Sequence, residues 1–191
     1  MNQEQLFWSG SGGDAYTTRS KQFKNYEFKD GFRFDFIKRI LFNVHKDSSV
    51  LELGCNSGNF IGFLKELGFK NITGVEINKL AYETCRQKHP DCEIINSSIE
   101  GFESDDKWDM VVTSGVLIHI LDVKQVIQKM ENLSRKYIFG NEYYSPSSYL
   151  VNWPSYCCCA DYANMFETKP KIDEVHETKD GELHSFYLIE K

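Results

Sequence analysis

Residues 49–60 read Ser-Val-Leu-Glu-Leu-Gly-Cys-Asn-Ser-Gly-Asn-Phe. The apolar run that ends at Leu53 is long enough for a buried strand, and glycines follow at Gly54 and Gly58. Apolar residues then recur at positions 60, 61, 63, 64 and 67, which is the spacing of one helix face. A strand, a tight glycine turn and a helix open nucleotide-binding α/β folds, because glycine lets the backbone approach a ligand and the helix start offers free N–H groups.

The turn carries the pattern Glu52-x-Gly54-x-Asn56-x-Gly58. It lacks the Gly-Lys-Ser/Thr of a phosphate loop and the third glycine of a dinucleotide fingerprint. An ordinary strand-to-helix turn is the alternative interpretation. The acid inside the strand resembles motif I of the class I S-adenosylmethionine-dependent methyltransferases. This resemblance implies S-adenosylmethionine as cofactor, S-adenosylhomocysteine as product, and a contact segment made of Glu52, Gly54, Cys55, Asn56, Gly58, Asn59 and Phe60.

Strand and helix patterns alternate along the rest of the chain, which predicts a parallel sheet with crossover helices. Two strand patterns at the end, 172–179 and 182–190, flank Asp180-Gly181, which is a hairpin signal. With the resemblance above, we expect an α/β protein with a Rossmann-like class I methyltransferase fold: a central, mostly parallel seven-stranded sheet, a C-terminal antiparallel hairpin, and helices on both faces. The other predicted elements are a helix at 31–45, helices capped by Asn78 and Asp122, strands at 72–77, 92–96, 108–114 and 137–140, and a short helix at 161–166.

Composition narrows the function classes. The 191 residues suffice for one domain with a sizeable core, and 41% of them are hydrophobic. A net charge of −6 without a long basic run disfavours a nucleic-acid substrate, because affinity for phosphate backbones comes from clustered Lys and Arg. The start of the chain has no secretory apolar segment, and no run has the length of a membrane span. We therefore expect a cytoplasmic protein, as a monomer or weak homodimer, without membrane contact.

The six cysteines match neither a disulfide framework nor a zinc site, so reduced thiols and no bound metal are expected.

The first 30 residues form a separate region in this interpretation. The cluster Gly10-Ser-Gly-Gly13 argues against a helix interior and predicts a flexible arm or lid. Tyr16 and Arg19 would supply a hydroxyl and a cation to the cofactor, whereas a disordered terminus with a few anchors is the alternative. Residues 31–191 are then a single methyltransferase domain, with an irregular substrate-side segment at about 141–170.

Strand ends supply the other cofactor candidates. Glu76 ends the second strand about twenty residues after the turn, where an acid can accept hydrogen bonds from both ribose hydroxyls; a salt bridge to a nearby Lys is the alternative. Ligands of open α/β sheets lie at the carboxyl ends of the strands. The further candidates at such ends are Ile77, Ser98 and Ile99 after the second and third strands, and Ser114 and Gly115 after the fourth.

The fourth strand is followed by Gly-Val-Leu-Ile-His119, which bears on the reaction type. The chain there has no Asn/Asp-Pro-Pro-Tyr and no Pro-Cys, so methylation of DNA amines or of pyrimidine carbons is disfavoured. A hydroxyl acceptor loses its proton during transfer, and histidine is the usual base near neutral pH. His119 is the candidate base, with a structural histidine as the alternative. The substrate-side candidates are Glu142, Tyr143 and Tyr144.

The chain also resembles a narrower family, the pseudaminic acid biosynthesis-associated methylases. The matching stretches are Phe7-Trp8, Tyr16-Thr-Thr-Arg19, Leu51–Asn59, Gly74–Asn78, Gly115–Ile120 and Asn141–Pro146. The resemblance implies methylation of an amino sugar or sugar nucleotide. The chain departs from the family at 151–162, where a basic segment is usual and this sequence has no Arg, Lys or His. It therefore lacks, in this segment, the cations that would suit an acidic sugar or a sugar nucleotide.

We therefore expect a methyltransferase for a hydroxyl or amine of a small polar metabolite. A non-catalytic S-adenosylmethionine-binding module and an N-methyltransferase of another small metabolite are the alternatives.

Overall fold

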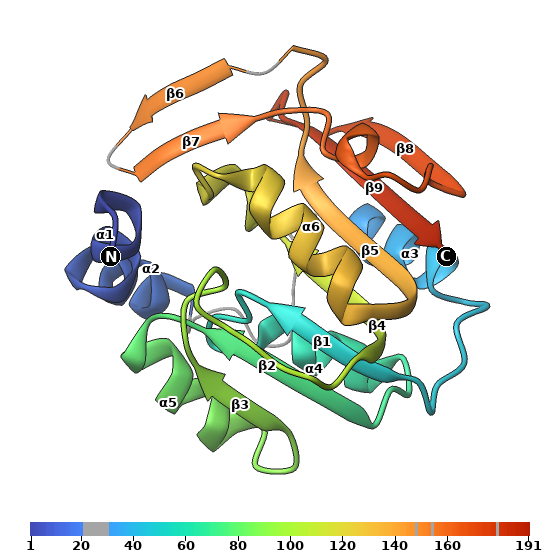
Figure 1. Ribbon diagram of the computed structural model, residues 1–191, viewed down its shortest axis with the longest axis horizontal. Coiled ribbons are helices and arrows are strands. Elements are labelled where there is room, and N and C mark those ends of the chain that lie inside the picture. Colours follow the sequence, from blue (N-terminus) through green and yellow to red (C-terminus); the bar gives the residue numbers. More distant parts are fainter. Residues whose placement is uncertain (21–30, 148, 154, 179) are drawn as a thin grey trace. The chain divides into compact units, whose positions relative to one another are not determined.

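The computed structural model describes residues 1–20, 31–147, 149–153, 155–178 and 180–191 (Figure 1). Seven strands form one mixed sheet, and a separate hairpin forms a second. The large sheet consists of β1 (Ser49–Leu53), β2 (Asn71–Glu76), β3 (Glu93–Asn96), β4 (Trp108–Ser114), β5 (Ser134–Tyr143), β8 (Ile172–Glu177) and β9 (Leu183–Glu190). Its strand order is β3-β2-β1-β4-β5-β9-β8. The predicted α/β sheet with a C-terminal antiparallel hairpin is confirmed.

The chain divides into two compact units, residues 1–103 and 104–191. In the first, β1, β2 and β3 pair in parallel, and Glu52 of β1 lies opposite Gly74 of β2. Because β1 is apolar except for Glu52, it is buried along its length after Ser49. The helices of this unit are α1 (Gln3–Ser9), α2 (Ser11–Ser20), α3 (Gly31–Ile40), α4 (Asn59–Glu66) and α5 (Lys79–Lys88).

Helix α4 follows the glycine turn as predicted. Its apolar face buries Phe60, Ile61, Phe63 and Leu64, and the Phe63 ring packs 4.3 Å from that of Phe34 on α3. Gly68 lies just after the helix with φ of 98°. Helices often end at a residue in the left-handed region, and glycine adopts that conformation most easily. The N–H of Phe69 donates to the carbonyl of Leu64 at 3.0 Å, so the helix end is closed.

In the second unit, β4 and β5 are parallel, while β9 pairs antiparallel with β5 and β8. Helix α6 (Val123–Leu133) begins after Asp122, whose carboxylate accepts from Gln125 N at 3.2 Å, as predicted for a cap. The 3-10 helices η1 (Leu117–His119) and η2 (Ala163–Met165) and the hairpin strands β6 (Tyr149–Trp153) and β7 (Ser155–Cys159) complete it. β7 packs beside η1.

Several sequence predictions are corrected by these elements. The glycine cluster was expected to exclude a helix, but α2 runs through Gly12 and Gly13. A Cβ at Gly13 would collide with the carbonyl oxygen of Trp8, so close packing requires a glycine at this position. The segment at 141–170 was expected to be irregular, yet it contains β6 and β7. The helix predicted at 31–45 ends at Ile40, and the fifth strand extends to Tyr143.

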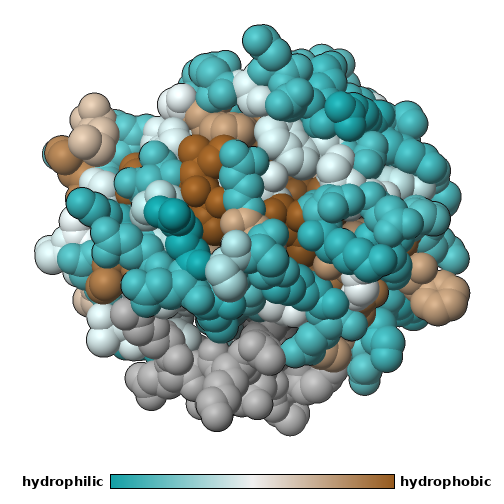
Figure 2. Space-filling view, turned by 90° about the horizontal axis from the view of Figure 1, so that it is seen from below, coloured by the Kyte–Doolittle hydropathy of each residue, from teal (hydrophilic) through white to brown (hydrophobic). Residues whose placement is uncertain are grey.

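Parts of some predictions lie outside the described residues: positions 21–30 of the arm, 148 and 154 of the substrate-side segment, and 179 of the C-terminal hairpin. Within the described part of the chain, no helix has the length and apolar character needed to cross a membrane. The face shown in Figure 2 is mostly hydrophilic, with hydrophobic residues visible between polar ones.

Candidate functional site

The glycine loop after β1 has three residues in the left-handed region: Gly54 at φ 77°, Asn56 at 46° and Gly58 at 78°. Two are glycines, and asparagine tolerates this region better than other side chains. The N–H groups of Gly54 and Cys55 both donate to the carbonyl of Val75, at 2.8 and 3.0 Å. The loop is therefore tied to the end of β2.

Glu76, at the end of β2, braces this loop. Its Oε2 accepts from Asn56 N at 2.8 Å, and its Oε1 accepts from Asn78 N at 2.7 Å. Burial raises the pKa of Glu76, while the backbone N–H groups of Asn78 and Asn56 oppose that rise. Each carboxylate oxygen has a second lone pair, so Glu76 can hold both segments and still accept from a ligand.

Two side-chain atoms in the stretch 52–58 have no hydrogen-bond partner among the described residues. Glu52 Oε2 and Ser57 Oγ are buried without a hydrogen bond. Burial raises the pKa of Glu52 well above its usual value, and nearby Cys85 and Glu76 raise it further. Because an unpaired buried polar group is costly, these atoms fit a ligand that brings its own donors. The ammonium group and hydroxyls of S-adenosylmethionine are such donors.

The N-terminal helices attach to this site through Asn78, which is buried. Its Oδ1 accepts from Ala81 N at 2.8 Å and so caps α5. Its Nδ2 donates to Trp8 O at 3.1 Å and to Asp14 Oδ1 at 2.9 Å. A second connection joins Ser20 Oγ to Asn56 Oδ1 at 3.1 Å. The side chain of Asn78, two residues after Glu76, thus caps α5 and also holds the N-terminal arm.

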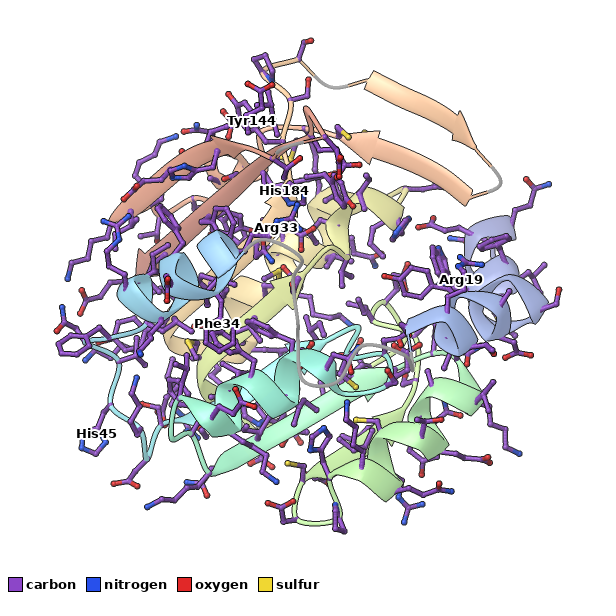
Figure 3. The ribbon with its side chains drawn as sticks, turned by 180° about the vertical axis from the view of Figure 1, so that it is seen from behind. Arg19, Arg33, Phe34, His45, Tyr144 and His184 are labelled. Atoms are coloured by element: carbon purple, nitrogen blue, oxygen red, sulfur yellow. The ribbon has the colours of Figure 1, made fainter. Side chains whose placement is uncertain are left out.

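Tyr16 and Arg19 both lie on α2. Tyr16 is 44% exposed, and its ring packs edge-on against Trp8 at 5.6 Å between centroids. The Arg19 guanidinium lies 5.8 Å from the Tyr16 ring centre. Figure 3 labels Arg19 on this helix. The two expected arm residues are therefore neighbours on one helix.

The other cofactor candidates of the first unit differ in exposure. Three of them, Cys55, Phe60 and Ile99, are buried in the core and could offer a ligand only their backbone groups. Ile77 is half-buried at the end of β2. Ser98 Oγ accepts from Gly101 N at 3.0 Å and orders the turn after β3, and Asn59 Oδ1 accepts from Lys88 Nζ at 2.7 Å.

The second unit places its candidates at the exit of β4. Gly115 has φ of 65°, and its N–H donates to Asn141 O at 2.8 Å. Asn141 Nδ2 donates to Ser114 Oγ at 3.0 Å. His119 ends η1 and is half-buried. Burial lowers the pKa of His119 to about 4, so its imidazole is neutral at pH 7 and can accept a proton.

The three substrate-side candidates are split by burial. Glu142 is 0% exposed, and its carboxylate accepts from backbone N–H groups of η1. This placement differs from the expected acceptor contact. Tyr143 is half-buried, and its ring lies tilted against the His184 ring with 4.3 Å between centroids. Tyr144 N donates to Leu183 O at 2.8 Å. Figure 3 labels Tyr144 and His184 in this region of β5 and β9.

Sequence reasoning missed the arm contacts of Asn78, Asp14 and Ser20. Asn78 was recognised as a helix cap, but a cap uses only the side-chain oxygen, and nothing local indicates what the amide nitrogen contacts.

Comparison with known proteins identifies the family. A family model described as "Methyltransferase domain" matches residues 24–162. No curated protein matches the sequence.

Solved structures share the fold. The magnesium protoporphyrin IX methyltransferase of Synechocystis PCC 6803, with bound S-adenosylmethionine, aligns at a TM-score of 0.73 and 12% identity over 100% of this chain and 99% of that one. A 1,6-didemethyltoxoflavin-N1-methyltransferase of Burkholderia thailandensis aligns at 0.71 and 14%, over 95% and 90%. The N-methyltransferase NodS of Bradyrhizobium japonicum WM9 aligns at 0.71 and 14%, over 93% and 97%. The protein therefore belongs to the methyltransferase-domain family and has the Rossmann-like class I fold of S-adenosylmethionine-dependent methyltransferases.

Proposed function

We propose that the protein transfers a methyl group from S-adenosylmethionine to a small polar metabolite, at a hydroxyl or amine of a sugar or sugar nucleotide. One observation carries the cofactor part. Glu76 is buried, braces the glycine loop through two backbone N–H groups, and retains lone pairs for a ligand. Its charge helps to raise the pKa of Glu52, whose Oε2 has no hydrogen-bond partner among the described residues. The similar structures named above include proteins crystallised with S-adenosylmethionine or S-adenosylhomocysteine, which supports the same cofactor here.

In this proposal Glu76 holds the ribose hydroxyls and Glu52 the ammonium group. Arg19 pairs with the methionine carboxylate in a charge-assisted contact, and Tyr16 adds a hydroxyl. The other predicted cofactor contacts remain Ser98, Ile99, Ser114 and Gly115. The bound cofactor supplies a methyl group on a positively charged sulfur, which is already activated for transfer.

His119 is the proposed proton acceptor for a hydroxyl substrate, because it lies on η1 directly after the exit of β4. Its imidazole is neutral at pH 7, although a pKa of about 4 makes it a weaker base than an ordinary histidine. Tyr143 and Tyr144 are the proposed acceptor contacts. Two of the similar structures are named for methylation of small molecules, magnesium protoporphyrin IX and 1,6-didemethyltoxoflavin, which supports a small-molecule acceptor. The resemblance to the pseudaminic acid-associated methylases supports a sugar. We also propose a cytoplasmic protein, monomeric or weakly dimeric, that uses no nucleic acid; the net charge of −6 supports the last point.

Two measurements test the function. Calorimetry with S-adenosylmethionine and S-adenosylhomocysteine should show binding of both. Release of S-adenosylhomocysteine should then depend on an acceptor, screened among hexosamines, N-acetylhexosamines and their uridine diphosphate derivatives. Binding without release for any acceptor would favour a non-catalytic module, and release only with amines would favour an N-methyltransferase. Absence of binding would reject the proposal.

We further propose that residues 1–30 serve as an arm that covers the cofactor. The variant Asn78→Asp tests this, because aspartate caps a helix about as well as asparagine but has no donor for Trp8 O. Its charge would also repel Asp14. Loss of about 1–1.5 kcal/mol of hydrogen bonding should speed proteolysis within residues 1–20 by about 5–10-fold. Cofactor affinity should fall several-fold.

A second substitution provides the control for this prediction. Adding Asp14→Asn to Asn78→Asp puts an amide donor back opposite the new carboxylate, so part of the protection should return. Asp14→Asn alone reports the effect of that residue. Equal cleavage rates in the parent and in Asn78→Asp would contradict the attachment described here.

A further inference from the structure

Glu142 lies at the carboxyl end of β5 and is completely buried. Its Oε2 accepts from Val116 N at 2.9 Å and from Leu117 N at 3.0 Å, and its Oε1 lies 3.3 Å from Val116 N. These N–H groups open η1, where a helix start has donors without helical partners. The carboxyl group therefore caps η1 from a neighbouring strand, twenty-six residues along the chain.

The surroundings of Glu142 fix the same loop. Asn141 O accepts from Gly115 N at 2.8 Å, so two consecutive residues of β5 hold consecutive residues of the β4 exit. Tyr187 and Tyr162 are both buried, and Glu142 helps to raise the pKa of each hydroxyl group. A Cβ at Gly140 would collide with the Tyr187 ring, so the ring lies directly on β5. Glu142 thus projects into a packed environment and away from solvent.

These contacts decide between two roles. A residue that contacts an acceptor needs an accessible polar atom, and Glu142 is 0% exposed. Its hydrogen bonds go to the segment that carries His119, whose own N–H donates to Val116 O at 2.9 Å. Fixing Val116 and Leu117 therefore fixes the turn that presents the His119 ring. A misplacement of about 1 Å can cost a factor of roughly 10² in rate, so such a support has a large effect on turnover.

We propose that Glu142 is a positioning residue, whose carboxyl group caps η1 and so sets the place of the His119 ring for proton transfer. The catalytic part of this inference rests on the proposed function, whereas the structural part concerns Glu142 and His119 alone. Both hydrogen bonds go mainly to one oxygen, Oε2. Burial raises the pKa of Glu142 to about 8, so its carboxyl group is mostly protonated at pH 7. A glutamine at this position can place its carbonyl oxygen there and keep both bonds, and it cannot ionise.

Two conservative variants separate the roles, because Glu142→Gln keeps the reach and removes the ionisable group, while Glu142→Asp keeps a carboxyl group and withdraws it by about 1.5 Å. If Glu142 positions η1, Glu142→Gln should keep kcat within about threefold, and Glu142→Asp should lower it by roughly 10–10². The Michaelis constants for cofactor and acceptor should change less than about threefold in both, because neither ligand touches Glu142.

The second readout needs no activity. NMR of the apoprotein follows the ring resonances and pKa of His119, assigned among the five histidines with His119→Ala. Glu142→Gln should leave them near the parent values. Glu142→Asp should move the resonances and raise the pKa from its value of about 4 toward the ordinary one, because a loosened η1 admits water to the ring. Melting temperatures of both variants show that the assays are run on folded protein.

The outcomes are distinct. Retention in Glu142→Gln with loss in Glu142→Asp supports positioning. The reverse order, with Glu142→Asp the more active, overturns it in favour of a role for an ionisable carboxyl group. An unchanged His119 ring in Glu142→Asp also overturns it. If the parent releases no S-adenosylhomocysteine with any acceptor, the proposed function fails, and the NMR comparison still decides whether Glu142 sets the place of His119. If Glu142→Asp does not fold, loss of turnover in Glu142→Gln suffices to reject the proposal.

Discussion

Replacing His119 by alanine is expected to lower the turnover number with a hydroxyl acceptor by roughly 10²–10⁴, the usual range for one general base. The cofactor dissociation constant should stay within a few-fold, since the proposed cofactor contacts do not include this ring. His119 lies on η1, directly after the β4 exit, and its neutral imidazole can accept the proton that the acceptor hydroxyl loses. Single-turnover measurements with saturating cofactor isolate the transfer step.

The pH dependence gives a second measure of the same residue. The parent should gain activity as pH rises through about 4, where His119 loses its proton, and this limb should be absent from the alanine variant. The free energy of unfolding changes with pH in the same direction as the activity. The folded pKa lies below the ordinary value of about 6.5, so the unfolded chain binds more protons between these values. Stability is therefore lost as pH falls from about 6.5 toward 4, and His119→Ala should lose less of it.

Three outcomes distinguish the roles of His119. A large fall in turnover at unchanged melting temperature and cofactor affinity indicates a base. A milder fall indicates an amine acceptor, which needs only its neutral form presented in line. Joint loss of melting temperature, cofactor affinity and turnover indicates a structural histidine. Unchanged turnover with unchanged stability would remove His119 from the mechanism and direct attention to Tyr143 and Tyr144.

Glu76→Ala is expected to weaken S-adenosylhomocysteine binding by about 10–100-fold, which corresponds to roughly 1.5–3 kcal/mol for lost charged hydrogen bonds. The structure adds a second cause. The carboxylate also holds Asn56 N and Asn78 N, so its removal leaves two backbone donors unpaired and frees the glycine loop. Calorimetry measures the affinity, and thermal unfolding without ligand measures the loop contribution separately.

Glu83→Ala serves as the matched control for this variant. Glu83 is an exposed carboxylate of the same unit, on α5, so its removal changes the net charge by the same amount. Affinity should then equal that of the parent. Glu76→Gln should resemble Glu76→Ala more than the parent, because an amide offers one acceptor oxygen where two backbone N–H groups need two. Cofactor binding that is indifferent to Glu76→Ala would contradict the proposed ribose contact.

Local patterns predicted the frame of the protein. The apolar runs and the following glycines located β1 and β4, and Asn78 and Asp122 were recognised as caps, because these signals depend on a few neighbouring residues. Helix α2 was missed because Gly13 is explained by the approach of Trp8 O and Gly12 by the approach of the Phe7 ring, which no local rule contains.

The cofactor residues of the candidate site were more predictable from the sequence than the substrate-side residues. The place of Glu76 follows from its distance to the glycine turn. The burial of Glu142 does not follow from its neighbours in sequence, since its partners are Val116 and Leu117. An acid at a strand end looks the same in the sequence whether it faces a ligand or caps a helix. Only the packing of β5 against the β4 exit separates the two.

The contact between Gly140 and the Tyr187 ring has an evolutionary consequence. The two residues lie opposite each other on β5 and β9, and the ring occupies the space that any side chain at position 140 would need. The ring is also fully buried, so shrinking it alone would leave a cavity. Each position therefore constrains the other. Across related chains, a larger residue at 140 should occur together with a smaller one at 187, and this correlated change can be sought in sequences alone.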